Sequence, residues 1–327
     1  MSIQNSADPS ASANRKTWLS RLEKIISSCI LSGHLQIGIY KEILTMNDCN
    51  RDPRVNLHTH TVRCKHASGS VDDYCREAVK AGITILGFTE HSPFHDREYF
   101  DSRMVFSEMP LYIREIEEAR VHYPQLTILS GLELDYRPIL GKQFYLDEFI
   151  HKYDLDYVIA GVHFLPAANG RRAHYVTWSN PMPLDILKAF VHESVHVMEL
   201  GIITYLAHPD LTARCLPRWT PDVRAAYLDI IDAAADLHIP LEINAYGLRK
   251  DWIDTPEGKR AQYPWLPFWE LVAEHGGIEV VTGSDAHRPE DVWGNLDDTF
   301  AIAEKAGLTV RNHAVAQRII ERKKSVR

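Results

Sequence analysis

Short apolar runs rich in β-branched residues alternate with segments of helical periodicity from about residue 54 onward. Seven runs are typical of buried strands: RVNLH, ITILGFTEH, LTILSGLEL, LDYVIAGVH, GIITYLAHPD, IPLEINAYG and GIEVVTGSDAH. Helical periodicity covers residues 71–81, 107–122, 144–153, 184–200, 221–237, 265–275 and 298–306. Ser107 with Glu108 and Pro110, and Thr220 with Pro221, are typical helix starts. Strands that alternate with helices in this way predict a parallel sheet.

Seven such strands predict an α/β fold, a closed or nearly closed (β/α)7 barrel of the TIM type. An open doubly wound sheet is the alternative, although no glycine-rich phosphate loop follows the first strand. Residues 1–15 are rich in Ser, Ala and Asn and are expected to form a disordered leader. Residues 16–50 contain amphipathic periodicity, broken near Ser32 and Gly33, which predicts an N-terminal helical extension. We expect the barrel domain over residues 51–327.

The composition argues against several classes of protein. The formal net charge is -8 and no basic cluster stands out, so a nucleic-acid partner is not expected. No apolar run approaches the roughly 18 residues of a membrane span, and the N-terminus lacks the apolar centre of a signal peptide. The five cysteines include no CxxC pair, and we interpret them as reduced thiols of a cytoplasmic protein. The sequence makes no prediction about oligomeric state.

Metal-ligating residue types follow the predicted strands. They are His58 and His60, His66 shortly after them, then His91, Glu133, His163, His208, Asp285 and His287. A single histidine at a strand end is usually an ordinary polar residue. Here the whole set falls at the carboxyl ends of parallel strands, which open on one face of a barrel. Histidine with carboxylate suits Zn, Fe or Mn, and nine ligands are too many for one ion. We therefore predict two or three divalent transition-metal ions.

The motifs HTHT, FTEH, GLELDY, GVHF, AHPDL and GSDAH resemble the PHP superfamily, named for polymerase and histidinol phosphatase, over about residues 54–310. The resemblance implies a distorted seven-stranded barrel with two or three metal ions. One ion would be held by His58, His60, Glu133 and Asp285. Glu133 would bridge to a second ion, held also by His163 and His208. A third would be held by His66, His91 and His287.

Within this superfamily, EINAYGLRK and DYVIAGVHFL look most like the histidinol-phosphatase branch. That branch hydrolyses L-histidinol phosphate to L-histidinol and phosphate in histidine biosynthesis. Two features depart from the pattern. Glu90 stands where the motif usually has aspartate, and it is expected beside the metals without ligating them. The first 50 residues have no counterpart in the compact members.

The expected reaction is metal-dependent hydrolysis of a small phosphate monoester, in which a hydroxide that bridges two ions attacks phosphorus. The residues expected to take part in catalysis are His58, His60, Glu133, Asp285 and His287. Arg214 and Arg249 follow strand ends, and their guanidinium groups suit phosphate oxygens. A surface ion pair is the alternative role for each arginine. The leaving alkoxide would take a proton from a metal-bound water or a histidine.

Other interpretations remain beside this one. HESVH, from His192 to His196, matches the HExxH motif of zinc proteases, but we interpret it as the polar face of a helix. The chain could act on another small phosphate ester, or serve as a regulatory PHP module that binds a partner through its N-terminal helix. His174, Tyr175 and Trp178 could contact a substrate ring or simply pack their loop.

Overall fold

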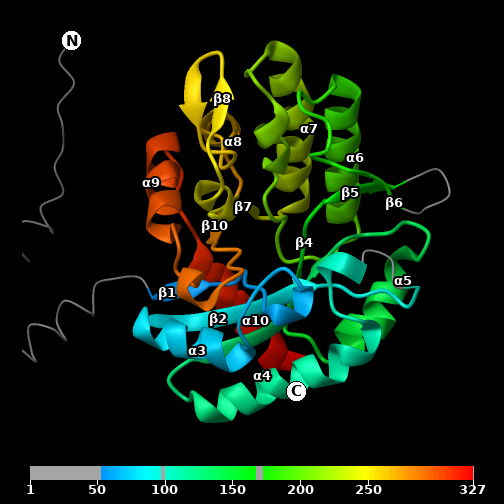
Figure 1. The fold of residues 1–327 in the computed structure, drawn as a ribbon, viewed down its shortest axis with the longest axis vertical. Coiled ribbons are helices and arrows are strands. Elements are labelled where there is room, and N and C mark those ends of the chain that lie inside the picture. Colours follow the sequence, from blue (N-terminus) through cyan, green and yellow to red (C-terminus); the bar gives the residue numbers. More distant parts are fainter. Residues whose placement is uncertain (1–52, 97–99, 167–171, 327) are drawn as a thin grey trace, which may run out of the picture. The chain divides into compact units, whose positions relative to one another are not determined.

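The computed structural model describes residues 53–96, 100–166 and 172–326. The predicted leader, residues 1–15, and the predicted helical extension, residues 16–50, lie outside the described residues. In the described part, parallel strands are surrounded by helices, as Figure 1 shows. None of the described helices combines the length and the apolar character that crossing a membrane requires.

The described residues contain six parallel strands. They are β1 (Arg54–Asn56), β2 (Ile83–His91), β3 (Thr127–Leu134), β4 (Tyr157–Ala160), β7 (Leu241–Asn244) and β10 (Val280–Gly283). The first four pair in sequence order, and β7 pairs with β10. Single parallel bridges join the two groups at both sides: Thr59 pairs with Ala286, and Leu206 pairs with Ala160 and Leu241. The strands therefore form a ring, as expected for a TIM-like barrel and not for an open sheet.

The predicted fifth strand, within residues 201–210, is not a regular strand. Leu206 alone forms ladder bridges: its amide donates to Pro240 O at 3.0 Å, and its carbonyl accepts from Glu242 N at 3.0 Å. The next bond of a parallel ladder would run from the amide of residue 240 to Thr204 O. Pro240 has no N–H, so this bond cannot form and the pairing is short. Within the described residues the barrel thus has six regular strands, and the segment around Leu206 bridges the gap between β4 and β7.

Helices cover the outside of the ring and one of its two ends. They are α3 (Val71–Lys80), α4 (Met109–His122), α5 (Gly141–Tyr145), α6 (Leu184–Glu199), α7 (Pro221–Leu237), α8 (Leu266–His275), α9 (Leu296–Ala306) and α10 (Asn312–Val326). The predicted helices agree with α3, α4 and α6 to α9 within a few residues. Thr220 caps α7 as predicted, by accepting from Val223 N at 3.2 Å. By contrast, α4 begins at Met109, not at Ser107, and α10 was not predicted.

Shorter elements complete the described chain. A π-helical turn, η4 (Leu146–His151), continues α5. Six 3-10 turns are η1 (Val62–Cys64), η2 (Phe100–Ser102), η3 (Phe106–Glu108), η5 (Leu211–Cys215), η6 (Tyr246–Arg249) and η7 (Pro289–Asp291). Two antiparallel hairpins pair β5 (Phe164–Pro166) with β6 (Arg172–Tyr175) and β8 (Ile253–Thr255) with β9 (Gly258–Arg260). Neither hairpin was predicted.

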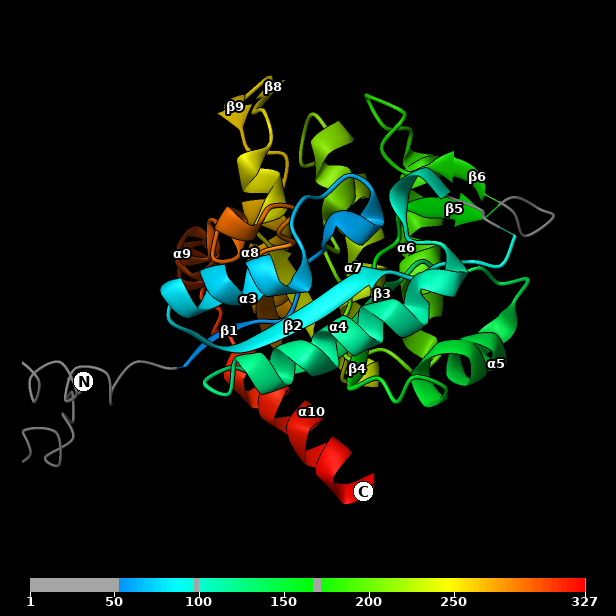
Figure 2. The same cartoon turned by 60° about the horizontal axis from the view of Figure 1, so that its bottom comes forward.

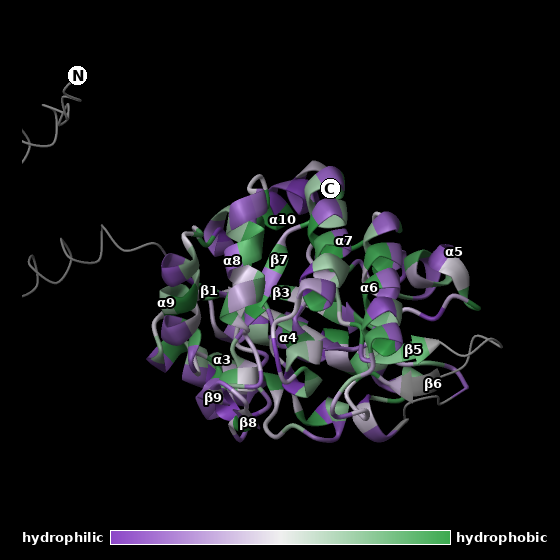
Figure 3. Ribbon diagram, turned by 90° about the horizontal axis from the view of Figure 1, so that it is seen from above, coloured by the Kyte–Doolittle hydropathy of each residue, from purple (hydrophilic) through white to green (hydrophobic). Residues whose placement is uncertain are grey.

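The barrel interior is apolar at the end where α10 lies. Side chains such as Val55, Ile85 and Val281 pack there with Val315 and Ile319 of α10. A second apolar layer lies between the ring and the surrounding helices. Figure 2 shows α10 on the opposite side of the strands from the two hairpins, and Figure 3 shows hydrophobic and hydrophilic residues alternating along the outer helices. One end of the barrel is thus closed, and the carboxyl ends of the strands face the other.

Candidate metal centre

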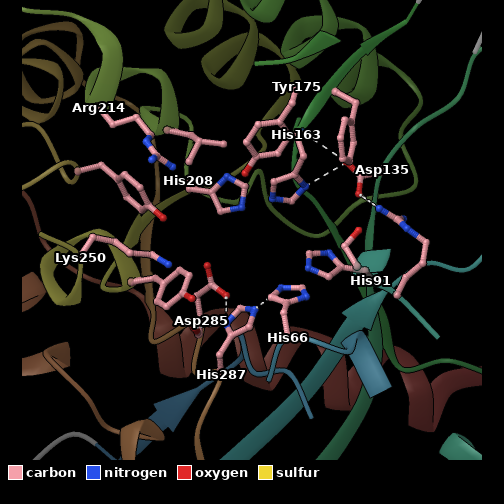
Figure 4. A pocket seen from close by; sticks show the side chains of 16 residues that line it. His66, His91, Asp135, His163, Tyr175, His208, Arg214, Lys250, Asp285 and His287 are labelled. Carbon is pink, nitrogen blue, oxygen red and sulfur yellow. Dashed lines mark hydrogen bonds and ion pairs between the residues drawn. The ribbon is translucent and has the colours of Figure 1, made fainter. Parts of the chain in front are cut away.

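All nine predicted ligands lie at or just beyond the carboxyl ends of the ring strands, and their side chains converge. His91 is the last residue of β2, and Glu133 lies near the end of β3. Six of the others follow a ring strand or the Leu206 segment within four residues, and His66 comes after the turn η1 that follows β1. Figure 4 shows several of them around one cavity. The structure thus brings together residues that are up to 229 positions apart, from His58 to His287.

Glu133 occupies the middle of this cluster. Its Oε1 lies 2.9 Å from His208 Nε2 and 3.8 Å from His163 Nε2, and its Oε2 lies 3.0 Å from His91 Nδ1. The backbone leaves room for this carboxylate, because a Cβ on Gly161 would lie 2.2 Å from Oε1. Each carboxylate oxygen therefore faces different imidazoles, which is the arrangement that a bridging ligand requires.

A second group of atoms surrounds His60. Its Nε2 lies 3.2 Å from His58 Nε2, 3.3 Å from Asp285 Oδ1 and 3.4 Å from Glu133 Oε2. His58 Nδ1 is 2.8 Å from Glu242 Oε1. When this carboxylate accepts from Nδ1, the lone pair of His58 Nε2 stays free. Two imidazole nitrogens and two carboxylate oxygens then face the same point, and they belong to the four residues expected to hold the first ion.

His66 and His287 form a third group. Their Nε2 atoms are 2.9 Å apart, while His66 Nδ1 donates to Cys64 O at 2.8 Å and His287 Nδ1 donates to Asp285 O at 3.0 Å. Both Nε2 atoms then carry lone pairs, which repel each other unless a cation or a proton lies between them. The third predicted member, His91, is less close, because its ring centre is 5.6 Å from that of His66. His91 therefore stands between the second and third groups.

Two of the clustered residues have unusual backbone angles. His208 has φ of 32° and Asp285 has φ of 48°, in the left-handed region that side chains other than glycine rarely adopt. Such strain costs on the order of 1 kcal/mol or more and is concentrated at functional sites. The surrounding structure therefore holds these two side chains in directions that an unstrained strand end would not give them.

Carboxylates behind the imidazoles were not predicted as part of the site. Asp135 Oδ1 lies 3.0 Å from His163 Nδ1, and its Oδ2 accepts from Arg103 Nη2 at 2.9 Å. Glu242 holds His58 in the same way from the interior of β7. The signal for Glu242 was an acid inside an apolar strand, which rarely remains buried without a partner. These contacts fix the rings and leave the opposite nitrogen available.

Glu90 lies where the sequence placed it, beside the cluster. One carboxylate oxygen accepts from the amide and the hydroxyl of Thr61, each at 2.5 Å. The other lies 3.9 Å from His60 Nδ1 and has no hydrogen bond among the described residues. Burial raises the pKa of Glu90, and His60 and Thr61 oppose this effect.

The electrostatic environment shifts the pKa values of the histidines in opposite directions. Burial lowers the pKa of His163, but Asp135 and Glu133 outweigh it and raise this pKa to about 9. Burial among other imidazoles lowers the pKa of His91 to about 3. Burial also opposes ionisation of Glu133 and Asp285, but the nearby histidines hold both pKa values well below the usual range. The centre therefore contains buried, ionised carboxylates together with imidazoles, some of which have a raised pKa and others a lowered pKa.

A cavity opens on this cluster and carries positive charge. Arg214 of η5 lines it and has no hydrogen bond or ion pair within the described ranges. Lys250 also lines it, with Nζ 3.6 Å from the centre of the Tyr246 ring, which in turn stacks on His287 at 4.7 Å. Sequence reasoning found Arg214 but missed Lys250, because a lysine after a turn has no distinctive signal.

Arg249, the second predicted phosphate ligand, does not line this cavity. Its guanidinium group donates to backbone carbonyls, namely those of Ala245, Gly294, Ser284 and Asp285. It also pairs with Asp291 at 3.6 Å. These contacts hold the backbone near Asp285 in place. Lys250, not Arg249, is therefore the second cation of the cavity beside Arg214.

The other candidate residues from the sequence also differ in whether they line the cavity. His192 and His196 lie on α6, with 77% and 36% of their side chains exposed, and neither lines the cavity. This agrees with the interpretation of HESVH as a polar helix face. Tyr175 lines the cavity, whereas Trp178 is 62% exposed and does not. The side chain of His174 lies outside the described residues.

The chemistry of the cluster fits divalent transition metals. Several buried atoms have no hydrogen-bond partner among the described residues, including His91 Nδ1, Glu133 Oε2, His208 Nδ1 and Asp285 Oδ1. Leaving such atoms unsatisfied is costly, whereas a bound cation would satisfy those that face the centre. Groups such as His58, His60 and Glu133 offer ligand atoms within 4.8 Å of one another. Imidazole and carboxylate ligands together suit Zn, Fe or Mn.

Comparison with known proteins agrees with this geometry. The model of the PHP domain matches residues 56–246. A probable histidinol-phosphatase of Deinococcus radiodurans is 30% identical over 258 residues, which cover 77% of this chain and 94% of that protein. The histidinol-phosphatase of Bacillus subtilis is 28% identical, over 72% and 94% of the two chains. A crystal structure of a histidinol phosphate phosphatase from Lactococcus lactis also matches, with a TM-score of 0.62 and 19% identity. The match covers 79% of this chain and 95% of that one, and that structure contains zinc, L-histidinol and phosphate. The chain therefore belongs to the PHP family.

Proposed function

We propose that this protein is a metal-dependent phosphatase that hydrolyses L-histidinol phosphate to L-histidinol and phosphate. The observation that carries the proposal is one juxtaposition. Six of the nine predicted metal ligands line a cavity that Arg214 and Lys250 also line, and neither cation has a carboxylate partner among the described residues. A dianionic phosphate group can meet cations on both sides there.

Phosphate monoesters hydrolyse very slowly without a catalyst, so the site must lower the barrier greatly. Divalent ions held by the nine residues would activate water at neutral pH and neutralise charge on the phosphoryl oxygens. The chain itself supplies the orientation. Glu133 and Asp285 hold their oxygens toward the centre, and the histidines present nitrogens whose direction is fixed by hydrogen bonds.

Arg214 and Lys250 would bind the phosphate oxygens that point away from the metal centre. The guanidinium group offers two parallel donors, and the ammonium group adds a point charge. Burial lowers the pKa of Lys250, and Asp285 opposes this effect. A lysine of this kind is a candidate proton donor to the leaving alkoxide, since proton transfer is more efficient when the donor pKa is closer to neutrality.

The organic part of the substrate would lie against aromatic walls. Tyr175 and Tyr263 line the same cavity with aromatic surface and hydroxyl groups, beside Tyr246, whose ring already contacts His287 and Lys250. An imidazole ring can stack on such faces. The names of the Deinococcus and Bacillus relatives support L-histidinol phosphate over other small phosphate esters.

The test is phosphate release from L-histidinol phosphate by the Zn- or Mn-loaded protein, beside a panel of other small phosphate monoesters. Turnover of roughly 1 per second or more on L-histidinol phosphate alone would support the reaction and the substrate. Preference for another ester would keep the reaction and reject this substrate. Absence of turnover on every ester, with metal bound, would reject the reaction.

His58→Ala and His192→Ala are a matched pair of variants. Both remove an imidazole, but His58 lies in the cluster and His192 lies exposed on α6. We expect the first to abolish turnover and the second to leave it unchanged. The opposite result would return the HESVH motif to consideration as the active site.

A further inference from the structure

Glu242 is a buried carboxylate at the centre of a hydrogen-bond network that joins three of the segments bearing metal ligands. It lies in β7 with none of its surface exposed. Its Oε1 lies 2.8 Å from His58 Nδ1, and its Oε2 accepts from His208 N at 3.1 Å and from Asn244 Nδ2 at 2.9 Å. Asn244 Nδ2 also lies 3.3 Å from Asp285 Oδ2. One side chain therefore connects His58, His208 and Asp285.

The contacts of Glu242 determine which ring nitrogen of a neutral His58 carries the proton. The two groups that face Oε2 are N–H donors, so Glu242 acts there as an acceptor. When Oε1 also accepts, the proton of a neutral His58 is on Nδ1 and the lone pair is on Nε2. That Nε2 faces His60 Nε2 at 3.2 Å and Asp285 Oδ1 at 3.7 Å. The other tautomer would place a hydrogen where a cation has to bind.

Gly283 provides the space that this carboxylate occupies. A Cβ on Gly283 would lie 1.9 Å from Glu242 Oε1 and 2.8 Å from His58 Cβ. The φ angle of Gly283 is not positive, so the backbone conformation by itself does not require glycine. Any larger side chain in β10 would push Glu242 away from His58.

We propose that Glu242, in the space left by Gly283, is a positioning residue of the metal centre. It holds His58 in the tautomer with the proton on Nδ1 and fixes His58 relative to His208 and Asp285. It thereby sets the affinity of the cation position at His58 and His60. The inference rests on the metal centre of the proposed function and is independent of which phosphate ester is the substrate.

Two variants disturb Glu242 by different routes. Glu242→Gln keeps the shape, but its amide group places donors against either His58 Nδ1–H or the two N–H groups at Oε2. Gly283→Ala removes no polar group from the chain but displaces the Glu242 carboxylate sterically. Loss of such a contact behind a metal ligand typically weakens binding about 10- to 100-fold. We expect this weakening for one bound zinc ion in both variants of the full chain, measured by competition with a chromophoric chelator and by metal analysis.

Asp156→Asn is the matched control. Asp156 is also a buried carboxylate, and it accepts from Ser130 N at 2.8 Å and from Arg120, but no predicted metal ligand contacts it. This variant should lose thermal stability and keep the zinc stoichiometry and affinity of the wild type. Equal weakening in all three variants would mean that the effect is general destabilisation, and it would overturn the proposal. Unchanged zinc affinity in folded Glu242→Gln and Gly283→Ala would overturn it as well.

A measurement on the wild-type chain remains decisive even if both variants fail to fold. In zinc-loaded protein with 15N-labelled histidine, we expect the proton of His58 on Nδ1, with its signal identified by its absence in His58→Gln. A proton on Nε2 would overturn the proposal while leaving the proposed function intact. Failure of the wild type to bind zinc at all would reject both, and this outcome is distinguished by metal analysis alone.

Discussion

The histidines of the metal centre differ in what each second ring nitrogen contacts. His163 Nδ1 faces Asp135, whereas His66 Nδ1 and His287 Nδ1 donate to backbone carbonyls. A carboxylate partner favours the protonated ring, but a carbonyl fixes the orientation without adding a full negative charge. His163 accordingly has a raised pKa, and burial lowers the pKa of His66 and of His287.

The pKa of His163, about 9, predicts proton release on metal binding. Between pH 7 and pH 9 the metal-free ring carries a proton that it must lose before Nε2 can bind a cation. The apparent zinc affinity should therefore rise with pH up to about pH 9 and then level off. His91, with a pKa of about 3, is already neutral at pH 7 and releases none. Calorimetry in buffers of different ionisation enthalpy counts the released protons.

Asp135→Asn tests the cause of this release. It removes the charge that raises the pKa of His163, so we expect about one proton fewer at pH 8. Glu148→Gln is the control and should leave the count unchanged, because this half-buried carboxylate pairs with Lys152 and His95 and with none of the predicted metal ligands. An unchanged count in Asp135→Asn would contradict the assignment of the proton to His163.

Arg214 and Arg249 predict opposite results for the same substitution. Arg214→Ala should lower kcat/KM by roughly 100-fold through loss of phosphate contacts and leave the melting temperature almost unchanged. Arg249→Ala removes the donor of four backbone carbonyls and should lower stability by about 2 to 3 kcal/mol. Steady-state kinetics and thermal unfolding of both variants check this. Reversed effects would show that Arg249 is the phosphate ligand after all.

At the scale of elements, the closed end of the barrel depends on α10, which sequence periodicity did not reveal. Its first residue, Asn312, accepts from Thr282 N at 2.7 Å and donates to Val55 O at 3.1 Å and Thr282 O at 2.9 Å. One side chain thus joins α10 to β1 and β10 below the metal centre. The helix was missed because its polar residues outnumber its apolar ones, although it contributes Val315 and Ile319 to the barrel core.

Asn312→Ala should destabilise the fold without altering the metal centre. It leaves buried backbone groups of β1 and β10 unsatisfied, at a cost of about 3 kcal/mol in the free energy of unfolding. Denaturant unfolding measures the loss, and zinc content per folded molecule should stay that of the wild type. Glu321→Ala, at an exposed position of the same helix, should have little effect. Loss of zinc from folded Asn312→Ala would show that α10 also shapes the site.

At the scale of the whole molecule, no single element contains the metal centre. The ring closes where Thr59 pairs with Ala286, between His58 and His60 on one side and Asp285 and His287 on the other. Predicted ligands from the start and the end of the domain therefore meet only in the folded state. Because the unfolded chain has no such cluster, metal binding free energy adds to folding free energy.

Metal removal should lower the melting temperature. A ligand at 100 times its dissociation constant stabilises the folded state by about 2.7 kcal/mol per site, so chelation should shift unfolding down by several degrees. Scanning calorimetry at a fixed rate, before and after chelation, measures the shift. Zinc or manganese should restore stability, whereas calcium should not, because the imidazole-rich ligand set suits transition metals. Restoration by calcium would contradict this donor set.

Much of the architecture followed from local patterns. β-branched runs between helical segments predicted the parallel strands, since period and composition are local properties. The short fifth strand was not predictable in this way, because its pairing fails at Pro240, a residue on the neighbouring strand. The hairpins β5–β6 and β8–β9 were missed for a related reason, as three- or four-residue strands carry too little pattern.

The sequence by itself determined which residue types stand at the strand ends, and hence the fold class and the prediction of nine metal ligands from His58 to His287. Parallel strands that share one polarity make that inference possible, since their carboxyl ends must face the same way. Only the tertiary structure showed which residues surround and orient the predicted ligands. It turned Arg249 toward backbone carbonyls, placed Lys250 in the cavity, and set Glu242 against His58 in the space beside Gly283. Such roles depend on distances between strands that are remote in sequence, and a local pattern contains no information about those distances.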